Sequence, residues 1–343
     1  MKPALIYGIT GYTGELIAKE LHHRGWNHIT IAGRNKHKTQ KIAKKYNLKW
    51  ISFDIHNRQE ITHHILPFKV ILNCAGPFIE TIHPLVDICI ENSIDYLDIT
   101  GESDVFLKLM RLSKKAKENH CTLLPGVGFD VVPSDCLAKH VHNLLPEATH
   151  LDIIILGVGS PSRGTINTAL RNLTIPTLTR TNSKLQKNPK PILKTIDVNN
   201  KKVQCIAISW GDIVTAYHST KIPNITVYFQ KSPAMIKAMK LPLIIKRIVS
   251  SSVVRKIIHA AMCCHPGPDQ TSLEKAETTL IAHAWNDTKE VKAKMTTPHG
   301  YTTTVQTALT CLELVMSTTV KPGFQTPSTA FPSLLEKLQY KVE

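Results

Sequence analysis

Three glycines near the start of the sequence, Gly8, Gly11 and Gly14, lie between the apolar run Ala4 to Tyr7 and a segment with helical spacing of apolar residues. Glycine permits a tight turn there and lets backbone N–H groups approach a pyrophosphate, whose charge is stabilised by the positive end of the helix dipole. A merely structural glycine turn is the alternative. The predicted dinucleotide-binding residues of this loop are Gly8, Thr10, Gly11, Tyr12, Thr13 and Gly14.

The end of the second predicted strand indicates which dinucleotide is bound. An NAD-preferring domain usually has Asp or Glu about 20 residues after the glycine loop, but this sequence has Arg34 and Asn35 there. A guanidinium can stack on the adenine and hold a 2′-phosphate, which a carboxylate would repel. We therefore predict NADP as the cofactor, with Arg34, Asn35 and Asp54 as contacts. The alternatives are a solvated strand end for Arg34 and a helix cap for Asp54.

A second glycine-containing turn, Ala75, Gly76, Pro77 and Phe78, follows the fourth predicted strand. Ligands of open α/β sheets bind beyond the carboxyl ends of the strands. These four residues are therefore predicted to pass under the dinucleotide, and an ordinary strand-to-loop turn is the alternative.

The elements that must position these residues follow from the apolar pattern. Short apolar runs alternate with polar or amphipathic segments from residue 4 to residue 124, which predicts parallel strands with helical crossovers. The expected fold class is α/β, with a Rossmann-type doubly wound parallel sheet over residues 1–130 and a mixed α+β domain for substrate or dimerisation over 131–299. The C-terminal region 300–343, with a helix at Thr303 to Ser317, is expected to return to the first domain.

The middle of the chain has a different pattern of predicted helices and strands. We expect a helix at Arg163 to Leu173, a polar basic connector at Thr177 to Pro191, and one long helix at Ala234 to Met262. Strands are expected at Val203 to Ile208, Ile225 to Phe229, Thr279 to Trp285 and Val291 to Met295.

Charge is concentrated in the same region. The whole chain of 343 residues has a net charge of +16, and residues 153–268 hold 17 Lys and Arg but two acids, Asp197 and Asp212. Such a surface attracts anions: cofactor phosphates, a phosphopantetheine or CoA thioester, or an acidic membrane. A solvated basic surface is the alternative.

The remaining composition excludes several classes. Eight cysteines without a CxxC pair indicate buried thiols in a reducing compartment rather than a zinc ribbon or disulfide scaffold. The 17 histidines lack metal-ligand spacing, so no metal is predicted. We expect no secretion signal and no membrane-crossing segment, and therefore a cytoplasmic protein that can be peripheral to a membrane.

With these motifs in place, the sequence resembles the saccharopine dehydrogenase-like oxidoreductases, particularly the branch called trans-acting enoyl reductases. Further matching segments are Tyr96 to Glu102, Pro125 to Asp135, Trp210 to Tyr217, Ile222 to Ile225 and Gln325 to Phe331. The resemblance implies an NADP-binding domain with a smaller α/β domain. In the enoyl reductase branch it also implies reduction of a carbon–carbon double bond in a lipid-like acyl chain.

The catalytic candidates are Tyr217 and Asp130. Tyr217 and its neighbour His218 lie in a segment that the resemblance marks, and either could supply a proton. Asp130 is expected on a glycine-rich turn after the sixth strand, facing the domain cleft. Asp98 and Glu102 are expected near the nicotinamide, although a helix cap explains Glu102 equally well. A packed aromatic is the alternative for Tyr217.

The leading hypothesis is an NADPH-dependent reductase of a hydrophobic acyl or polyketide-like substrate. A catalytically inactive NADP-binding sensor or scaffold is the alternative. The expected partners are the acyl substrate, an anionic membrane surface or an acyl carrier at the basic stretch Lys237 to His259, and a second copy in a homodimer. For that stretch, an amphipathic helix that packs on its own sheet with a basic outer face is the alternative. Specific nucleic-acid binding is not expected because aromatic residues are sparse in the basic region.

Overall fold

The computed structural model describes residues 1–198, 200–261 and 267–343, which form two compact units. The first unit contains residues 1–136 and 301–340, and the second contains 137–300 and 341–343. The helix α8 (Val132–Leu144) runs from the first unit into the second. The C-terminal helix therefore belongs to the same unit as the N-terminal strands.

The first unit begins with a regular alternation of strands and helices. Its strands are β1 (Ala4–Tyr7), β2 (Thr30–Gly33), β3 (Lys49–Ser52), β4 (Val70–Asn73), β5 (Asp95–Asp98), β6 (Thr122–Leu124) and β15 (Gly323–Phe324). Its helices are α1 (Tyr12–His23), α2 (Lys36–Tyr46), α3 (Arg58–Ile65), α4 (Phe78–Thr81), α5 (Leu85–Glu91), α6 (Ser103–Arg111), α7 (Ser113–Glu118), α15 (Gly300–Ser317), α16 (Pro327–Ala330) and α17 (Leu334–Lys337).

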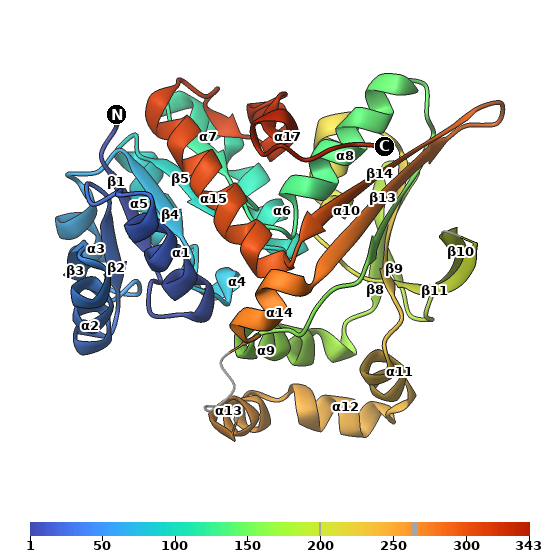
Figure 1. Ribbon diagram of the computed structural model, residues 1–343, viewed down its shortest axis with the longest axis horizontal. Helices are drawn as coiled ribbons and strands as arrows, with labels where there is room; N and C mark the ends of the chain where they lie inside the picture. Colours follow the sequence, from blue (N-terminus) through green and yellow to red (C-terminus); the bar gives the residue numbers. More distant parts are fainter. Residues whose placement is uncertain (199, 262–266) are drawn as a thin grey trace. The chain divides into compact units, whose positions relative to one another are not determined.

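The seven strands form one parallel sheet in the order β15-β6-β5-β4-β1-β2-β3. Strands β1 to β5 are labelled in Figure 1. The strand order reverses between β1 and β4, which is where an open α/β sheet binds its ligand. The strands β1, β2 and β4 are fully buried because each is covered on both faces. The predicted Rossmann-type fold is confirmed.

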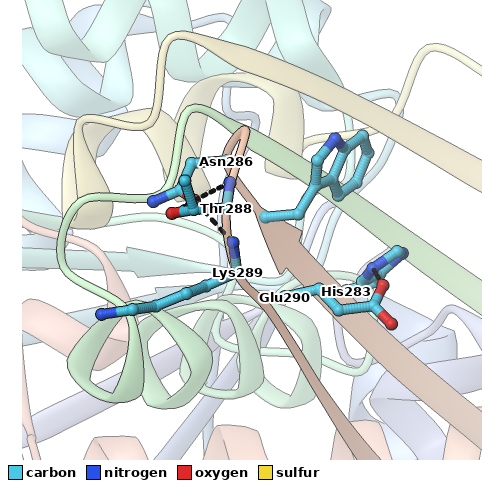
Figure 2. Close-up of a pocket in the computed structure, with 6 residues that line it drawn as sticks. His283, Asn286, Thr288, Lys289 and Glu290 are labelled. Atoms are coloured by element: carbon cyan, nitrogen blue, oxygen red, sulfur yellow. Dashed lines mark hydrogen bonds and ion pairs between the residues drawn. The ribbon is translucent and has the colours of Figure 1, made fainter.

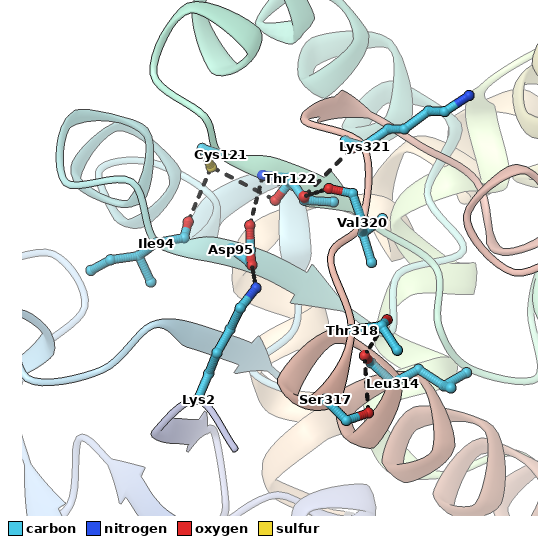
Figure 3. A network of polar contacts seen from close by, with 10 residues as sticks. All are labelled: Lys2, Ile94, Asp95, Cys121, Thr122, Leu314, Ser317, Thr318, Val320 and Lys321. Carbon is cyan, nitrogen blue, oxygen red and sulfur yellow. Dashed lines mark hydrogen bonds and ion pairs between the residues drawn. The ribbon is translucent and has the colours of Figure 1, made fainter.

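The amino end of this sheet is fastened by a polar network around Asp95 (Figure 3). Its carboxylate accepts from the Lys2 ammonium at 2.9 Å and from the backbone N–H of Thr122 at 2.9 Å. The Thr122 hydroxyl donates to the carbonyls of Val320 and Lys321, each at 3.5 Å. These bonds join β5 and β6 to the chain that follows α15, at the end of the sheet opposite the glycine loop.

The second unit combines a mixed sheet with short helices. Its strands are β7 (His150–Leu156), β8 (Thr177–Thr181), β9 (Lys184–Asn188), β10 (Leu193–Val198), β11 (Lys201–Ala207), β12 (Asn224–Gln230), β13 (Glu277–Trp285) and β14 (Glu290–Pro298). Its helices are α9 (Arg163–Arg171), the 3-10 turn η1 (Asn172–Thr174), α10 (Asp212–Thr220), α11 (Pro233–Lys240), α12 (Leu243–Ser250), α13 (Ser252–Ala261) and α14 (Gln270–Lys275).

The main path of this sheet is β10-β11-β12-β7-β13-β14, with β7 and β12 parallel and the other pairs antiparallel. Along β13, buried and less buried residues alternate as expected for a strand with one covered face. The predicted mixed character of the second unit is confirmed. Among the described residues, no helix is both long enough and apolar enough to cross a bilayer.

Two of the predictions for the second unit are wrong. The connector predicted at Thr177 to Pro191 is instead the hairpin β8–β9, whose turn residues Asn182 and Ser183 have φ of 47° and 65°. Both central residues of a type I′ turn require positive φ. The short strands β8 and β9 are rich in Lys and Thr rather than apolar residues, so no strand was expected there.

The single helix expected at Ala234 to Met262 is three helices, α11, α12 and α13, and Met262 lies outside the described residues. Pro242 cannot donate a helix hydrogen bond and restricts the residue before it. Leu241 accordingly leaves the helical region, with ψ of 136°. A second break occurs at Ser251, with ψ of 148°.

Candidate cofactor site and catalytic residues

The turn between β1 and α1 passes directly against the end of β4. Gly8 has φ of +91°, and a Cβ on it would lie 2.5 Å from the backbone nitrogen of Ala75. A Cβ on Gly14 would lie 2.4 Å from the carbonyl oxygen of Gly8. Both glycines are therefore required by backbone packing within the domain, which is the structural reason for glycine in such a turn.

Gly11 differs from the other two glycines because its position is open. A Cβ there would have its nearest neighbour at 3.4 Å, an ordinary contact distance. Gly11 is the N-cap of α1 and provides no side-chain hydrogen bond to the first turn. The positive end of the helix dipole is thus not covered by a side chain of its own cap, as a diphosphate site requires.

Arg34 lies at the carboxyl end of β2 with its side chain exposed. The Ser52 hydroxyl fixes the backbone here by donating to the carbonyls of Gly33 at 2.9 Å and Arg34 at 3.3 Å. Burial raises the pKa of nearby Tyr7 to about 12, and the charge of Arg34 opposes that rise. Arg34 makes no ion pair within the described residues, so its guanidinium is available to an anion.

The neighbouring predicted contacts have local roles in the fold. Asn35 is the N-cap of α2, and its side chain accepts from the backbone N–H of Lys38 at 3.0 Å. Asp54 accepts from the backbone N–H of His56 at 3.0 Å. The cap of α3 is Asn57, so the interpretation of Asp54 as that cap is wrong. Their contacts with a cofactor stay predictions.

The turn after β4 is held by side chains from two directions. The Thr81 hydroxyl donates to the carbonyl of Ala75 at 2.6 Å, and the Ala75 N–H donates to Asn73 Oδ1 at 3.0 Å. The Phe78 N–H donates to Glu102 Oε1 at 2.9 Å. Glu102 is the N-cap residue of α6, but its side chain makes no capping hydrogen bond, so the alternative of a helix-capping carboxylate is wrong. Its carboxylate holds the start of α4 instead.

A fully buried polar network connects the carboxyl ends of β4, β5 and β6. The Tyr96 hydroxyl accepts from Asn73 Nδ2 at 3.2 Å and donates to Asp98 Oδ2 at 3.0 Å. The other Asp98 oxygen accepts from the backbone N–H groups of Thr100 and Gly126, both at 3.0 Å. Burial raises the pKa of Asp98 to about 6, although these hydrogen bonds oppose the rise. Asp98 therefore fixes the loops of the site and is too enclosed, at 0% exposure, to meet a substrate.

Asp130 lies on the turn between β6 and α8, close to the loop after β5. Its Oδ2 would be 2.5 Å from a Cβ on Gly101, so the carboxyl packs against the Gly101 backbone. Burial, and then the charge of Glu102, raise the pKa of Asp130 to about 7. A carboxyl with this pKa can hold or release a proton near neutral pH.

Tyr217 belongs to the second unit, on α10. The Arg180 guanidinium lies over its ring at 3.9 Å from the centroid, and the Lys221 ammonium at 5.6 Å. Arg180 is buried, donating to the carbonyls of Ile213 at 3.0 Å and Ser183 at 2.7 Å. Tyr217 is thus a half-buried ring under a fixed cation, and its catalytic role stays a prediction.

Several residues of the site had no signal in the sequence. The Thr304 hydroxyl of α15 accepts from the Phe129 N–H at 3.1 Å, and Thr304 packs against Gly128. Ser52 and Thr81 bond to backbone groups 19 and 6 residues away. Ordinary Ser and Thr residues become positioning groups only when the chain brings them beside a turn.

The second unit has an open pocket of about 400 Å³ at the tip of the β13–β14 hairpin (Figure 2). It is lined by His283, Trp285, Asn286, Thr288, Lys289 and Glu290. His283 Nε2 lies 2.7 Å from Glu290, and Asn286 Oδ1 accepts from the N–H groups of Thr288 and Lys289. None of the residues predicted from the sequence to bind or react lines this pocket.

The parallel sheet, the bare glycine turn at its switch point and the exposed arginine after β2 define a Rossmann-type dinucleotide-binding domain. Residues 4–124 match the family model described as the saccharopine dehydrogenase NADP binding domain. Residues 4–124 of the first unit are therefore similar to the NADP-binding domain of saccharopine dehydrogenases, and the predicted resemblance and nicotinamide cofactor are confirmed.

Curated relatives extend the same resemblance at modest identity. The human saccharopine dehydrogenase-like oxidoreductase is 29% identical over 162 residues, which cover 40% of this chain and 37% of that protein. The trans-acting enoyl reductase of Mycobacterium ulcerans is 28% identical over 150 residues, which cover 42% of this chain and 36% of that protein. The chain thus matches little more than a third of the length of either relative.

Two solved structures share the fold over the whole chain. Saccharopine dehydrogenase (L-Glu forming) from Saccharomyces cerevisiae matches with a TM-score of 0.66 at 13% identity, covering 100% of this chain and 99% of that chain. Homospermidine synthase from Legionella pneumophila, in complex with NAD, matches with a TM-score of 0.67 at 9% identity, covering 100% and 91%. At these identities the likeness concerns the fold.

Proposed function

We propose that this protein is an NADPH-dependent oxidoreductase of the saccharopine dehydrogenase type. The observation that carries the proposal is the pairing of the glycine cradle with Arg34. Gly8 and Gly14 fix the turn by backbone packing, Gly11 leaves the start of α1 open, and Arg34 presents an exposed cation at the neighbouring strand end. Diphosphate and 2′-phosphate groups fit these two places.

We infer that the substrate is a lipid-like acyl or polyketide chain with a reducible double bond. The similarity to proteins named trans-acting enoyl reductase supports this choice. The basic excess of residues 153–268 also supports it, because a thioester carried on CoA or phosphopantetheine is anionic.

NADPH, when bound, supplies a hydride, and the protein supplies position and a proton. Asp130 is the stronger candidate for the proton, since its carboxyl can be protonated at neutral pH. Tyr217 is the second candidate. The loops that carry Ala75, Phe78 and Thr100 are held through Asn73, Glu102 and Asp98, so the site is preorganised.

Oxidation of NADPH against a panel of enoyl thioesters tests the proposal. We expect turnover with at least one thioester, loss of turnover in Asp130→Asn, and a smaller loss in Tyr217→Phe. NADPH binding without oxidation across the panel would favour the inactive sensor, which shares the binding site but lacks the chemistry.

A further inference from the structure

Helices α12 and α13, which contact each other, carry six exposed aliphatic side chains, which we call the apolar ridge. The exposed fractions are 55% for Leu243, 71% for Ile244, 42% for Ile245, 55% for Ile248, 66% for Val253 and 62% for Ile257. Single exposed apolar residues are common on proteins, but a concentration of them on two contacting helices indicates an interaction surface. Half of the large apolar residues that are exposed in the described chain lie in these two helices.

The amphipathic orientation of α12 is inverted relative to a helix that packs on its own core. It has no buried residue, and Lys246 and Ser250 are less exposed than Ile244 and Ile248. It packs mainly on α9, η1 and α13. For α12, the alternative of a basic outer face is therefore wrong, because Ile244 and Ile248 are more exposed than Lys246.

Helix α13, which carries part of the ridge, is held in place by hydrogen bonds of Arg255. Arg255 of α13 donates to the Ser250 carbonyl at 3.1 Å and to Asn167 Oδ1 of α9 at 3.2 Å. This basic side chain is therefore used within the protein. The apolar side chains at Val253 and Ile257 project on the other side of α13, because positions four apart share a helix face.

The sequence segment that contains the ridge has only basic charged residues. No acid occurs between Asp212 and Asp269, and the same stretch contains eight Lys and Arg residues. Lys237 and Arg247 are exposed, and Arg247 is the neighbour in sequence of the ridge residue Ile248. Basic residues near an anionic bilayer are attracted to its acidic headgroups.

The composition of the ridge favours lipid over a protein partner. Protein interfaces are enriched in Tyr, Trp, Met and Arg at their centre, whereas this ridge contains only Leu, Ile and Val. Helices of 8 and 10 residues are too short to span a bilayer. Their geometry suits a position in the plane of the headgroups with the apolar side chains inserted.

We propose that the apolar ridge of α12 and α13, flanked by Lys237 and Arg247, docks the protein on an anionic lipid surface. The expected contact combines aliphatic insertion with attraction to acidic headgroups. This inference does not depend on the reaction that the protein catalyses.

Vesicle co-sedimentation of the full chain tests it. We expect binding to phosphatidylcholine vesicles that contain phosphatidylglycerol, little binding to phosphatidylcholine alone, and release by high salt. The variant Ile244→Ser/Ile248→Ser should bind anionic vesicles at least about tenfold more weakly. Lys237→Gln/Arg247→Gln should also weaken binding and reduce its dependence on salt.

The matched control is Leu66→Ser/Leu144→Ser, because these side chains are 48% and 58% exposed but lie outside the ridge. It should bind vesicles like the wild type, and all variants should keep the wild-type affinity for NADPH. Equal vesicle binding by Ile244→Ser/Ile248→Ser and the wild type would overturn the proposal. So would vesicle-independent dimerisation that this variant abolishes, or tight binding of an acidic carrier protein without vesicle binding.

Discussion

The Glu102 carboxylate accepts a hydrogen bond of 2.9 Å from the backbone N–H of Phe78, 24 residues earlier in the chain. This bond joins the loop after β5 to the start of α4. The same carboxylate also raises the pKa of Asp130, in addition to the larger effect of burial. Glu102 therefore connects the shape of the predicted cofactor site with the acidity of the predicted proton donor.

Two substitutions at Glu102 should separate these roles. Glu102→Gln keeps an acceptor for Phe78 but removes the charge, so the pKa of Asp130 should fall below about 7. The limb of the pH profile of kcat/KM that reports Asp130 should move to lower pH, as should its carboxyl titration by NMR. Glu102→Ala should do the same and also weaken NADPH binding by about 1 kcal/mol, because the turn loses its hydrogen bond. An unchanged titration of Asp130 in both variants would contradict this account.

Gly8 should control the stability of the fold, whereas Gly11 should control the affinity for the cofactor. Gly8→Ala should destabilise the protein by more than about 3 kcal/mol, since it combines positive φ with a 2.5 Å backbone clash. Gly25→Ala is the control, with φ of +66° but no neighbour within 4 Å, and should cost about 1 kcal/mol. Thermal unfolding measures both.

Gly11→Ala should fold normally, because its added Cβ would have ordinary contacts. It should nevertheless bind NADPH about tenfold more weakly or worse, since the methyl group occupies the approach to the diphosphate. Calorimetric titration measures the affinity for NADPH. An affinity equal to that of the wild type would mean that the diphosphate does not bind at this turn.

Arg34→Gln should change the choice of cofactor. Loss of a charge-assisted contact with the 2′-phosphate, worth about 1.5–3 kcal/mol, should reduce the preference for NADPH over NADH about 10- to 100-fold. The affinity for NADH should stay close to that of the wild type. Lys36→Gln, a neighbouring exposed cation on α2, is the control, and an equal effect there would mean that general charge attraction sets the preference.

Asp95 should affect stability without affecting the cofactor. Asp95→Ala leaves the buried N–H of Thr122 without its acceptor and removes the partner of Lys2, so it should cost about 2–3 kcal/mol. Asp95→Asn keeps an acceptor and should cost less. Calorimetry on both variants should return the wild-type NADPH affinity, because this network lies at the opposite end of the sheet.

The raised pKa of Asp130 predicts a sign for the pH dependence of folding. An unfolded aspartate titrates near 3.9, whereas Asp130 in the folded protein titrates at about 7. Between these values the folded state retains a proton that the unfolded state has lost, so this group lowers stability as pH rises. Near pH 8, Asp130→Asn should be more stable than the wild type by on the order of 1–3 kcal/mol, with the difference disappearing near pH 4. Asp104→Asn, an exposed acid on α6, should not show this pattern in denaturant titrations at several pH values.

Local sequence determined much of the first unit. The spacing of Gly8, Gly11 and Gly14 between an apolar run and an amphipathic segment predicts the strand, turn and helix that the structure contains. Arg34 could be placed at the end of β2 for the same reason. These features are encoded by neighbouring residues, because a glycine turn and a helix start depend on a few consecutive dihedral angles.

Tertiary structure decided which polar groups meet. Glu102, for which a helix cap was the alternative, bonds to Phe78, and Asp98 is enclosed by Tyr96 and backbone amides. The outward orientation of Ile244 and Ile248 was equally invisible in the sequence, since an amphipathic pattern does not state which face is covered. Partners separated by many residues are fixed only when strands pair and helices pack, and burial then sets their pKa values and their access to solvent.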